Sequence, residues 1–219
     1  MIGVAGVRGI LAGKGRSMLR RRTVLGAALL PVLADPARAT PPDLAFAVIR
    51  EGRQIGTHLV RFRQEGELLR ARSEVRITVR IAGFTVYRYT HDTEEAWRGN
   101  RLVALDSRLD DNGHKGACEA RAEGNGLRLR STAGEWLMPM NAAPLTWWRA
   151  ASLLADLPLF DPEEGRPVEP RLERRAEGGG QRVTLIGGEG AEVLYNASGR
   201  WVGFSTTGED GIRVTYRPA

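Results

Sequence analysis

The stretch LLRARSEVRITVRI, residues 68–81, has a strict period of two over its second half. One set of alternate positions is aliphatic: Val75, Ile77, Val79 and Ile81. The positions between them are polar: Glu74, Arg76, Thr78 and Arg80. Because successive side chains of a strand point to opposite faces, this pattern predicts a long strand with one buried and one solvated face. Such strands belong to antiparallel sheets.

The same alternation recurs on both sides of this stretch, interrupted by short turns rich in glycine, asparagine and charged residues. Further strands are expected at 44–50, 55–64, 84–97, 102–111, 117–123, 127–131, 135–139, 183–186, 191–195, 200–206 and 211–217. Residues 144–160 differ, because Leu145, Trp148, Ser152 and Leu153 have helical spacing and predict a helix of two or three turns that ends before Pro158.

Ten to twelve strands and one helix predict an all-β fold with a minor α component. We expect a long antiparallel meander that curves into a half-barrel or open barrel around one short helix. A closed up-and-down barrel is the alternative.

The net charge of +6 could suggest a nucleic-acid partner, but the basic residues are concentrated at the N-terminus. Residues 1–39 hold seven basic groups and one acid, which leaves 25 basic and 25 acidic groups in residues 40–219. A DNA- or RNA-binding protein needs an excess of cations to displace counterions from phosphates. The neutral balance of residues 40–219 therefore argues against a nucleic-acid partner.

The N-terminal region has the features of an export signal. Arg21 and Arg22 precede a short apolar run, and Ala37 and Ala39 form an A-x-A cleavage pattern. We expect residues 1–39 to be a signal, with Met18 as the true start and the twin-arginine route favoured over the Sec route. Residues 40–219 are then a single β-rich domain in the periplasm or outside the cell, with no membrane-spanning segment.

The chain contains one cysteine, Cys118, so it has no internal disulfide, and we expect the thiol to be a small buried group.

Residues 86–97, VYRYTHDTEEAW, carry the densest group of candidate functional side chains. An unbroken strand places Tyr87, Tyr89, His91, Glu95 and Trp97 on one face. In the strand at 55–64, the alternation puts His58 on the inward face, and Trp148 comes from the predicted helix. We predict that His58, Tyr87, Tyr89, His91 and Trp97 form one ligand-binding wall, with Trp148 at its mouth.

Alternative interpretations of these residues stay open. The histidines could be core residues that bond to tyrosines or to the backbone, a His–Glu pair could act as a general acid and base, and His58, His91 and a carboxylate could bind a metal. No nucleophile motif, phosphate-binding loop or HExxH sequence is present, so we predict no catalytic residue, no metal and no cofactor.

Residues 86–116 also resemble an uncharacterised family of secreted bacterial proteins, one of the domain-of-unknown-function families. The resemblance is carried by the YRYTH segment, Glu95 and Trp97, the turn GNRL at 99–102 and the acidic loop DDNG at 110–113. Similar segments lie at 51–58, near 147–148 and at 199–204. The resemblance implies no activity. More distantly, the strand pattern is similar to the half-barrels of lipoprotein-localisation carriers, an analogy of fold alone.

Three functions are compatible with these features. The leading hypothesis is a protein that binds a lipid or another hydrophobic small molecule in a concave cleft. The second is a non-catalytic interaction protein that uses sheet edges to bind an envelope protein. The third is a hydrolase-like enzyme with a His/carboxylate site. In each case we expect a monomer.

Overall fold

The computed structural model describes residues 40–187, 190–208 and 210–219. The described residues belong to one compact unit. The predicted signal residues Arg21, Arg22, Ala37 and Ala39 lie outside the described residues, so the export signal stays a prediction.

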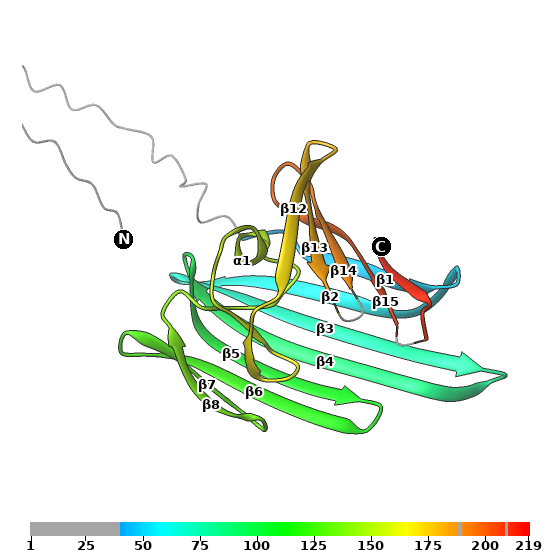
Figure 1. Ribbon diagram of the computed structural model, residues 1–219, viewed down its shortest axis with the longest axis horizontal. Coiled ribbons are helices and arrows are strands. Elements are labelled where there is room, and N and C mark those ends of the chain that lie inside the picture. The colour runs from blue at the N-terminus through cyan, green and yellow to red at the C-terminus, as the bar shows by residue number, and fades with distance from the viewer. Residues whose placement is uncertain (1–39, 188–189, 209) are drawn as a thin grey trace, which may run out of the picture. The chain divides into compact units, whose positions relative to one another are not determined.

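The fold is built almost entirely of strands (Figure 1). The elements are β1 (Leu44–Arg50), β2 (Arg53–Glu65), β3 (Leu68–Ile81), β4 (Phe84–Arg98), β5 (Arg101–Asp111), β6 (His114–Glu123), β7 (Gly126–Ser131), β8 (Gly134–Pro139), β9 (Ala143–Pro144), α1 (Ala150–Leu154), β10 (Leu159–Asp161), β11 (Arg166–Val168), β12 (Arg171–Glu177), β13 (Gly180–Ile186), β14 (Ala191–Tyr195), β15 (Trp201–Thr207) and β16 (Arg213–Pro218). The predicted all-β class with one short helix is confirmed.

Thirteen strands form one antiparallel sheet in the order β12-β13-β14-β15-β16-β1-β2-β3-β4-β5-β6-β7-β8. β1 and β16 are the first and last strands of the described residues, and they pair with each other. This pairing joins strands β12–β16 to strands β1–β8 in one sheet. β12 and β8 are the edges of the sheet, which is therefore curved but not closed. The predicted half-barrel or open barrel is confirmed, with more strands than the ten to twelve expected.

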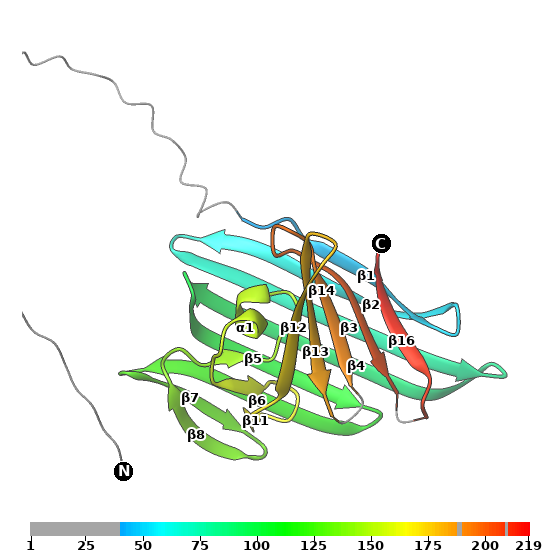
Figure 2. The same ribbon diagram turned by 45° about the horizontal axis from the view of Figure 1, so that its top comes forward.

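The connection between the two edge strands lies on the inner face of the curved sheet. We call residues 140–170 the plug segment; it contains α1 and the small sheet β11-β10-β9. Figure 2 shows α1 beside β12. Arg174 of β12 donates from Nε to the carbonyl oxygen of Leu153 over 2.7 Å, which ties the helix to this edge.

The plug segment fills the middle of the sheet with apolar side chains. Leu153 and Phe160 are fully buried against residues from both halves of the sheet, including Leu105, Val183 and Trp201. Burial of such side chains stabilises a fold by roughly 1.5–3 kcal/mol each. The inner face is therefore a packed core over most of its area.

The helix is shorter than the spacing of residues 144–160 predicts. Ala143 and Pro144 pair in parallel with Leu159 and Phe160, so both ends of this stretch are extended. Arg149 also has extended dihedral angles, which confines the helix to Ala150–Leu154. The prediction that Trp148 lies on the helix is wrong, because backbone pairing outside the helix takes precedence over the apolar spacing.

Candidate functional site

The inner face of β4 follows the predicted alternation. His91, Thr93, Glu95 and Trp97 are buried, while Tyr87 and Tyr89 are half-buried. Tyr89 pairs with Ile77 of β3, and His91 pairs with Val75, which also pairs with His58 of β2. The register therefore brings His58, Tyr89 and His91 into neighbouring positions on the inner face.

Each buried histidine is bonded to a serine on a neighbouring strand. His58 Nε2 lies 2.7 Å from Ser73 Oγ, and His91 Nε2 lies 2.9 Å from Ser107 Oγ. The two pairs have the same geometry. Val75 is the direct cross-strand partner of His58, and Ser73 stands two residues before it. Leu109 is the direct cross-strand partner of His91, and Ser107 stands two residues before it. Diagonal neighbours on one face of a sheet are within reach of long side chains.

Burial holds both histidines in the neutral state. Loss of solvent, and to a lesser extent the neighbouring His91, lowers the pKa of His58 to about 3. Burial lowers the pKa of His91 to about 4, although the nearby Asp161 and Asp92 act in the opposite direction. His58 also packs edge-on against Trp201 and Tyr216, with ring centroids 5.0 Å and 5.7 Å away.

A turn of the plug segment brings a carboxylate to the open side of this group. Asp161 accepts a hydrogen bond from the backbone of Glu163 over 2.7 Å, and Gly165 closes the turn with a left-handed φ of +65°. A Cβ at Gly165 would lie 2.3 Å from the Cβ of Ser131, so only glycine allows this close approach.

Glu163 then contacts two of the predicted residues. The hydroxyl of Tyr89 donates to Glu163 Oε1 over 2.7 Å, and His91 Nδ1 lies 3.5 Å from the same oxygen. Burial, followed by the charge of Glu163, raises the pKa of Tyr89 above its ordinary value. Tyr87 and Tyr216 are close enough to act on the same pKa in the same direction. We name this set the anchor cluster: His58, Ser73, Tyr89, His91, Ser107 and Glu163.

The hydrogen bonds of Ser107 do not favour nucleophilic catalysis. Its side chain is only 3% exposed, and its hydroxyl donates to the carbonyl oxygen of Pro162 over 2.7 Å. With that proton engaged, Ser107 Oγ accepts from His91 Nε2, whereas a general base would have to take a proton from the serine. The pair suits positioning of the histidine better than activation of the serine.

The two predicted tryptophans form a separate group. The indole N–H of Trp97 donates to Glu95 Oε2 over 2.7 Å, and that of Trp148 donates to Glu95 Oε1 over 3.0 Å. The guanidinium of Arg149 lies 4.1 Å from the centroid of the Trp97 ring. Burial raises the pKa of Glu95, which these donors partly oppose. The group attaches the plug segment to β4, and Trp148 packs in the core cluster. Its predicted place at the mouth of a cleft stays a prediction.

Sequence reasoning therefore identified part of the anchor cluster and missed the rest. It placed His58, Tyr89 and His91 on the inner face, but it did not find Ser73, Ser107 or Glu163. The alternation pattern could have identified both serines. Ser73 in 68–81 and Ser107 in 102–111 stand at positions whose side chains point to the inner face. Glu163 carries none, because it stands in a loop with no periodicity.

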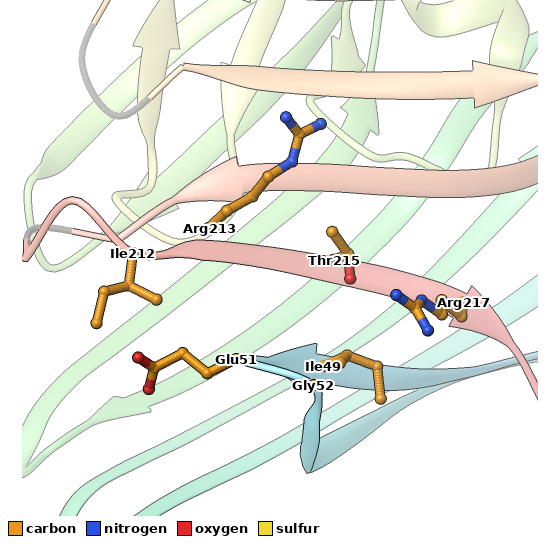
Figure 3. Close-up of a pocket in the computed structure, with 7 residues that line it drawn as sticks. All are labelled: Ile49, Glu51, Gly52, Ile212, Arg213, Thr215 and Arg217. Atoms are coloured by element: carbon orange, nitrogen blue, oxygen red, sulfur yellow. The ribbon is translucent and has the colours of Figure 1, made fainter.

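Two surface hollows lie away from the anchor cluster. One, of about 300 Å³, is lined by Ile49, Glu51, Gly52, Ile212, Arg213, Thr215 and Arg217. Figure 3 shows that these side chains spread along β1 and β16 and do not converge on a common point. The second, of about 350 Å³, is lined by Arg53, Gln54, Ile55, Thr78 and Arg80. Across residues 40–187, 190–208 and 210–219, no three potential ligands are grouped to hold a metal ion.

Residues 46–219 match a family described as a domain of unknown function, DUF6134. The chain belongs to this family. The predicted membership of a domain-of-unknown-function family is thus confirmed, and the match covers all strands of the sheet, although it begins two residues inside β1. No curated protein matches the chain.

One solved structure shows that the fold of this DUF6134 domain is shared. A beta-barrel-like protein of the domain of unknown function DUF1849 from Brucella abortus superposes with a TM-score of 0.55 at 9% identity, over 83% of this chain and 97% of that chain. A DUF1089 family protein from Pseudomonas aeruginosa gives a TM-score of 0.40 at 15% identity, over 79% of this chain and 94% of that chain. In the part of the DUF6134 chain that the structure describes, no helix has the length and apolarity needed to cross a bilayer.

Proposed function

We propose that the protein binds an amphiphile at the end of the inner face that the plug segment leaves uncovered. The observation that carries this proposal is a gradient of burial along β3. Val75 is buried, Ile77 and Val79 are half-buried, and all three lie on the inner face. An apolar face that continues past its own covering segment is suited to receive an apolar chain.

Half-buried aromatic rings extend this surface sideways. Tyr87 pairs with Val79 and Tyr89 with Ile77 across the β3–β4 ladder. Tyr216 of β16 packs edge-on against Phe204, with ring centroids 4.9 Å apart. We name this surface the open face: Ile77, Val79, Tyr87, Tyr89 and Tyr216.

The anchor cluster supplies polar groups at the inner end of the open face. The Tyr89 hydroxyl and the carboxylate of Glu163 face each other there, and the Glu163 side chain is 43% exposed. A few placed polar groups beside an apolar surface fix the orientation of a ligand. The proposed ligand therefore lays its apolar chain along Ile77 and Val79 and directs its polar head to Tyr89 and Glu163.

The proposal includes the compartment that the sequence suggests. Arg21, Arg22 and the pattern Ala37-Arg38-Ala39 favour export before the domain functions, so the ligand would be a hydrophobic molecule of the cell envelope.

A second candidate function, docking of an envelope protein, is favoured by the open edges of the sheet. β8 is an edge strand and carries Leu137, which is 64% exposed. An uncovered edge can accept a strand from another chain.

The deciding experiment is titration of the purified domain with a fluorescent fatty acid below its micelle concentration. Val79→Ser should weaken binding roughly tenfold, because it removes an apolar contact of the ligand chain. The matched control is Arg72→Ala on the opposite face of the same strand, where Arg72 pairs with Glu74 and Glu94. Equal effects of both substitutions, or no binding of any amphiphile by the unaltered domain, would exclude the open face as a ligand site.

A further inference from the structure

The β3–β4 hairpin extends beyond the rest of the sheet. The last pairing of β3 with β2 joins Ile77 to Gly56, and the last pairing of β4 with β5 joins Tyr89 to Asp111. Beyond those pairs, residues 78–88 form a ribbon of two strands, which we call the arm. Figures 1 and 2 both show this hairpin reaching past its neighbours.

The turn at the end of the arm is tight. Ala82 and Gly83 both have left-handed dihedral angles, with φ of 49° and 88°. Two such residues in succession form the hairpin turns whose twist matches that of the strands. Ile81 and Phe84 pair directly across this turn, so their side chains lie together at the tip.

The tip carries the largest cluster of exposed apolar side chains in the described residues. Phe84 is 76% exposed, Ile81 is 63% exposed and Val86 is 47% exposed. Among the described residues only two other large apolar side chains are exposed, Leu137 and Ile186. Exposed apolar side chains that cluster at one projection mark a contact surface, whereas single ones need no explanation.

The charge of the arm is positive and uncompensated. Residues 78–88 contain Arg80 and Arg88 and no acid, and Arg53 shares with Arg80 the hollow of about 350 Å³ at the base of the arm. In the described part of the chain, no carboxylate lies within ion-pair distance of these three arginines.

Nearer the middle of the same strands, the arginines are paired. Arg76 contacts both carboxylate oxygens of Asp92, at 2.7 Å and 2.8 Å, and Arg72 lies 3.2 Å from Glu94. The loss of acidic partners therefore coincides with the start of the arm.

We propose that the arm is a docking element for an anionic phospholipid bilayer. Ile81, Phe84 and Val86 enter the interface between headgroups and acyl chains, and Arg53, Arg80 and Arg88 contact the phosphates. The combination of an apolar tip with flanking unpaired cations matches the chemistry of such a surface. Three apolar side chains on a narrow ribbon are too few for the roughly 800 Å² that each partner contributes to a stable protein–protein interface.

The apolar and cationic side chains that this proposal uses lie outside the open face, although Val79 and Tyr87 belong to the same ribbon. The proposal does not depend on a bound ligand. Cosedimentation with vesicles of phosphatidylcholine and phosphatidylglycerol measures it directly, with ligand-free protein. Phe84→Ser should lower the partition coefficient roughly tenfold. Leu137→Ser, which removes another exposed apolar side chain on β8, is the control and should leave partitioning unchanged.

The contribution of charge has its own matched pair. Arg80→Gln should weaken partitioning about fivefold at low salt. Arg171→Gln, which removes the same charge from an exposed position on β12, should have no effect. Equal losses from both variants, or equal binding to pure phosphatidylcholine, would overturn the role of the arginines.

Insertion of the tip can be observed with a single fluorophore. Cys118 is buried, with a pKa raised to about 12, so it should resist labelling in the folded protein. A label that responds to polarity, attached after Val86→Cys, should shift to the blue with anionic vesicles, while the same label after Leu137→Cys should not. If the Val86 label does not shift, or if the Phe84 variant partitions normally, the tip does not enter a bilayer and the proposal is wrong.

Discussion

The two buried histidines predict a steep loss of stability in mild acid. In the unfolded chain, each histidine has an ordinary pKa near 6.5, whereas burial lowers the pKa to about 3 for His58 and about 4 for His91. Between pH 7 and pH 5 the unfolded chain takes up a proton at each position and the folded protein does not. The free energy of unfolding should therefore fall with pH by about 2 kcal/mol per histidine, or about 4 kcal/mol in total.

Other groups contribute little in the same direction over this range. Carboxylates with a lowered pKa, such as the half-buried Glu74 and the exposed Glu177, cost stability only below their ordinary value near 4.5. Glu95 acts in the opposite sense, because its raised pKa favours the folded state as the pH falls. The measured slope should thus be no steeper than the two histidines allow.

Urea unfolding followed by tryptophan fluorescence at pH 7, 6 and 5 gives the test. His58→Phe should reduce the loss of stability between pH 7 and 5 by about 2 kcal/mol, because phenylalanine does not titrate. It should also lower stability at pH 7 by about 1–3 kcal/mol, because Ser73 loses its buried partner. His114→Gln, at the exposed first residue of β6, is the control and should change neither quantity. A pH dependence that is the same in the His58 variant and the unaltered protein would refute the neutral, buried state of His58.

Two further predictions address the core and the signal. Trp97→Ala removes a side chain that is 1% exposed and should lower the free energy of unfolding by about 3–5 kcal/mol in the same urea assay; a loss below about 1 kcal/mol would contradict its burial. Replacing Arg21 and Arg22 by lysine should trap an unprocessed precursor in the producing cell, and N-terminal sequencing of the exported form should begin at Thr40. Normal export of the double variant would instead assign the Sec route.

The fold was accessible from the sequence because its main signal is local. Alternation in 68–81 and 84–97 determines which side chains face inward, and every buried residue of β4 except Ala96 conforms to it. Ala96 is buried on the opposite face, next to a register shift in the pairing of β4 with β5. The alternation pattern could not predict the pairing of β1 with β16. These strands are far apart in the sequence, and alternation within a strand does not indicate which other strand it pairs with.

For the candidate site, the sequence predicted which face the side chains lie on, but it did not predict which residues they bond to. Parity placed His91 and Tyr89 on the inner face, yet the carboxylate that contacts both comes from Glu163, about seventy residues later in a turn. Trp148 failed for a related reason. Its spacing was helical, but Ala143 and Pro144 pair with β10, Arg149 is extended, and the helix begins only at Ala150.

The inner face has two parts that burial separates, and their contrast bears on function. Around Phe160 and Trp201 the plug segment satisfies the apolar surface of the sheet, and a purely structural domain would need nothing more. The inward apolar positions nevertheless continue through Ile77 and Val79, where they are only half-buried. Partly exposed aliphatic side chains gain little stability from the fold itself, since the benefit of burial scales with the area removed from water. This contrast is the physical basis of our proposal that a hydrophobic ligand covers the exposed part of Ile77 and Val79.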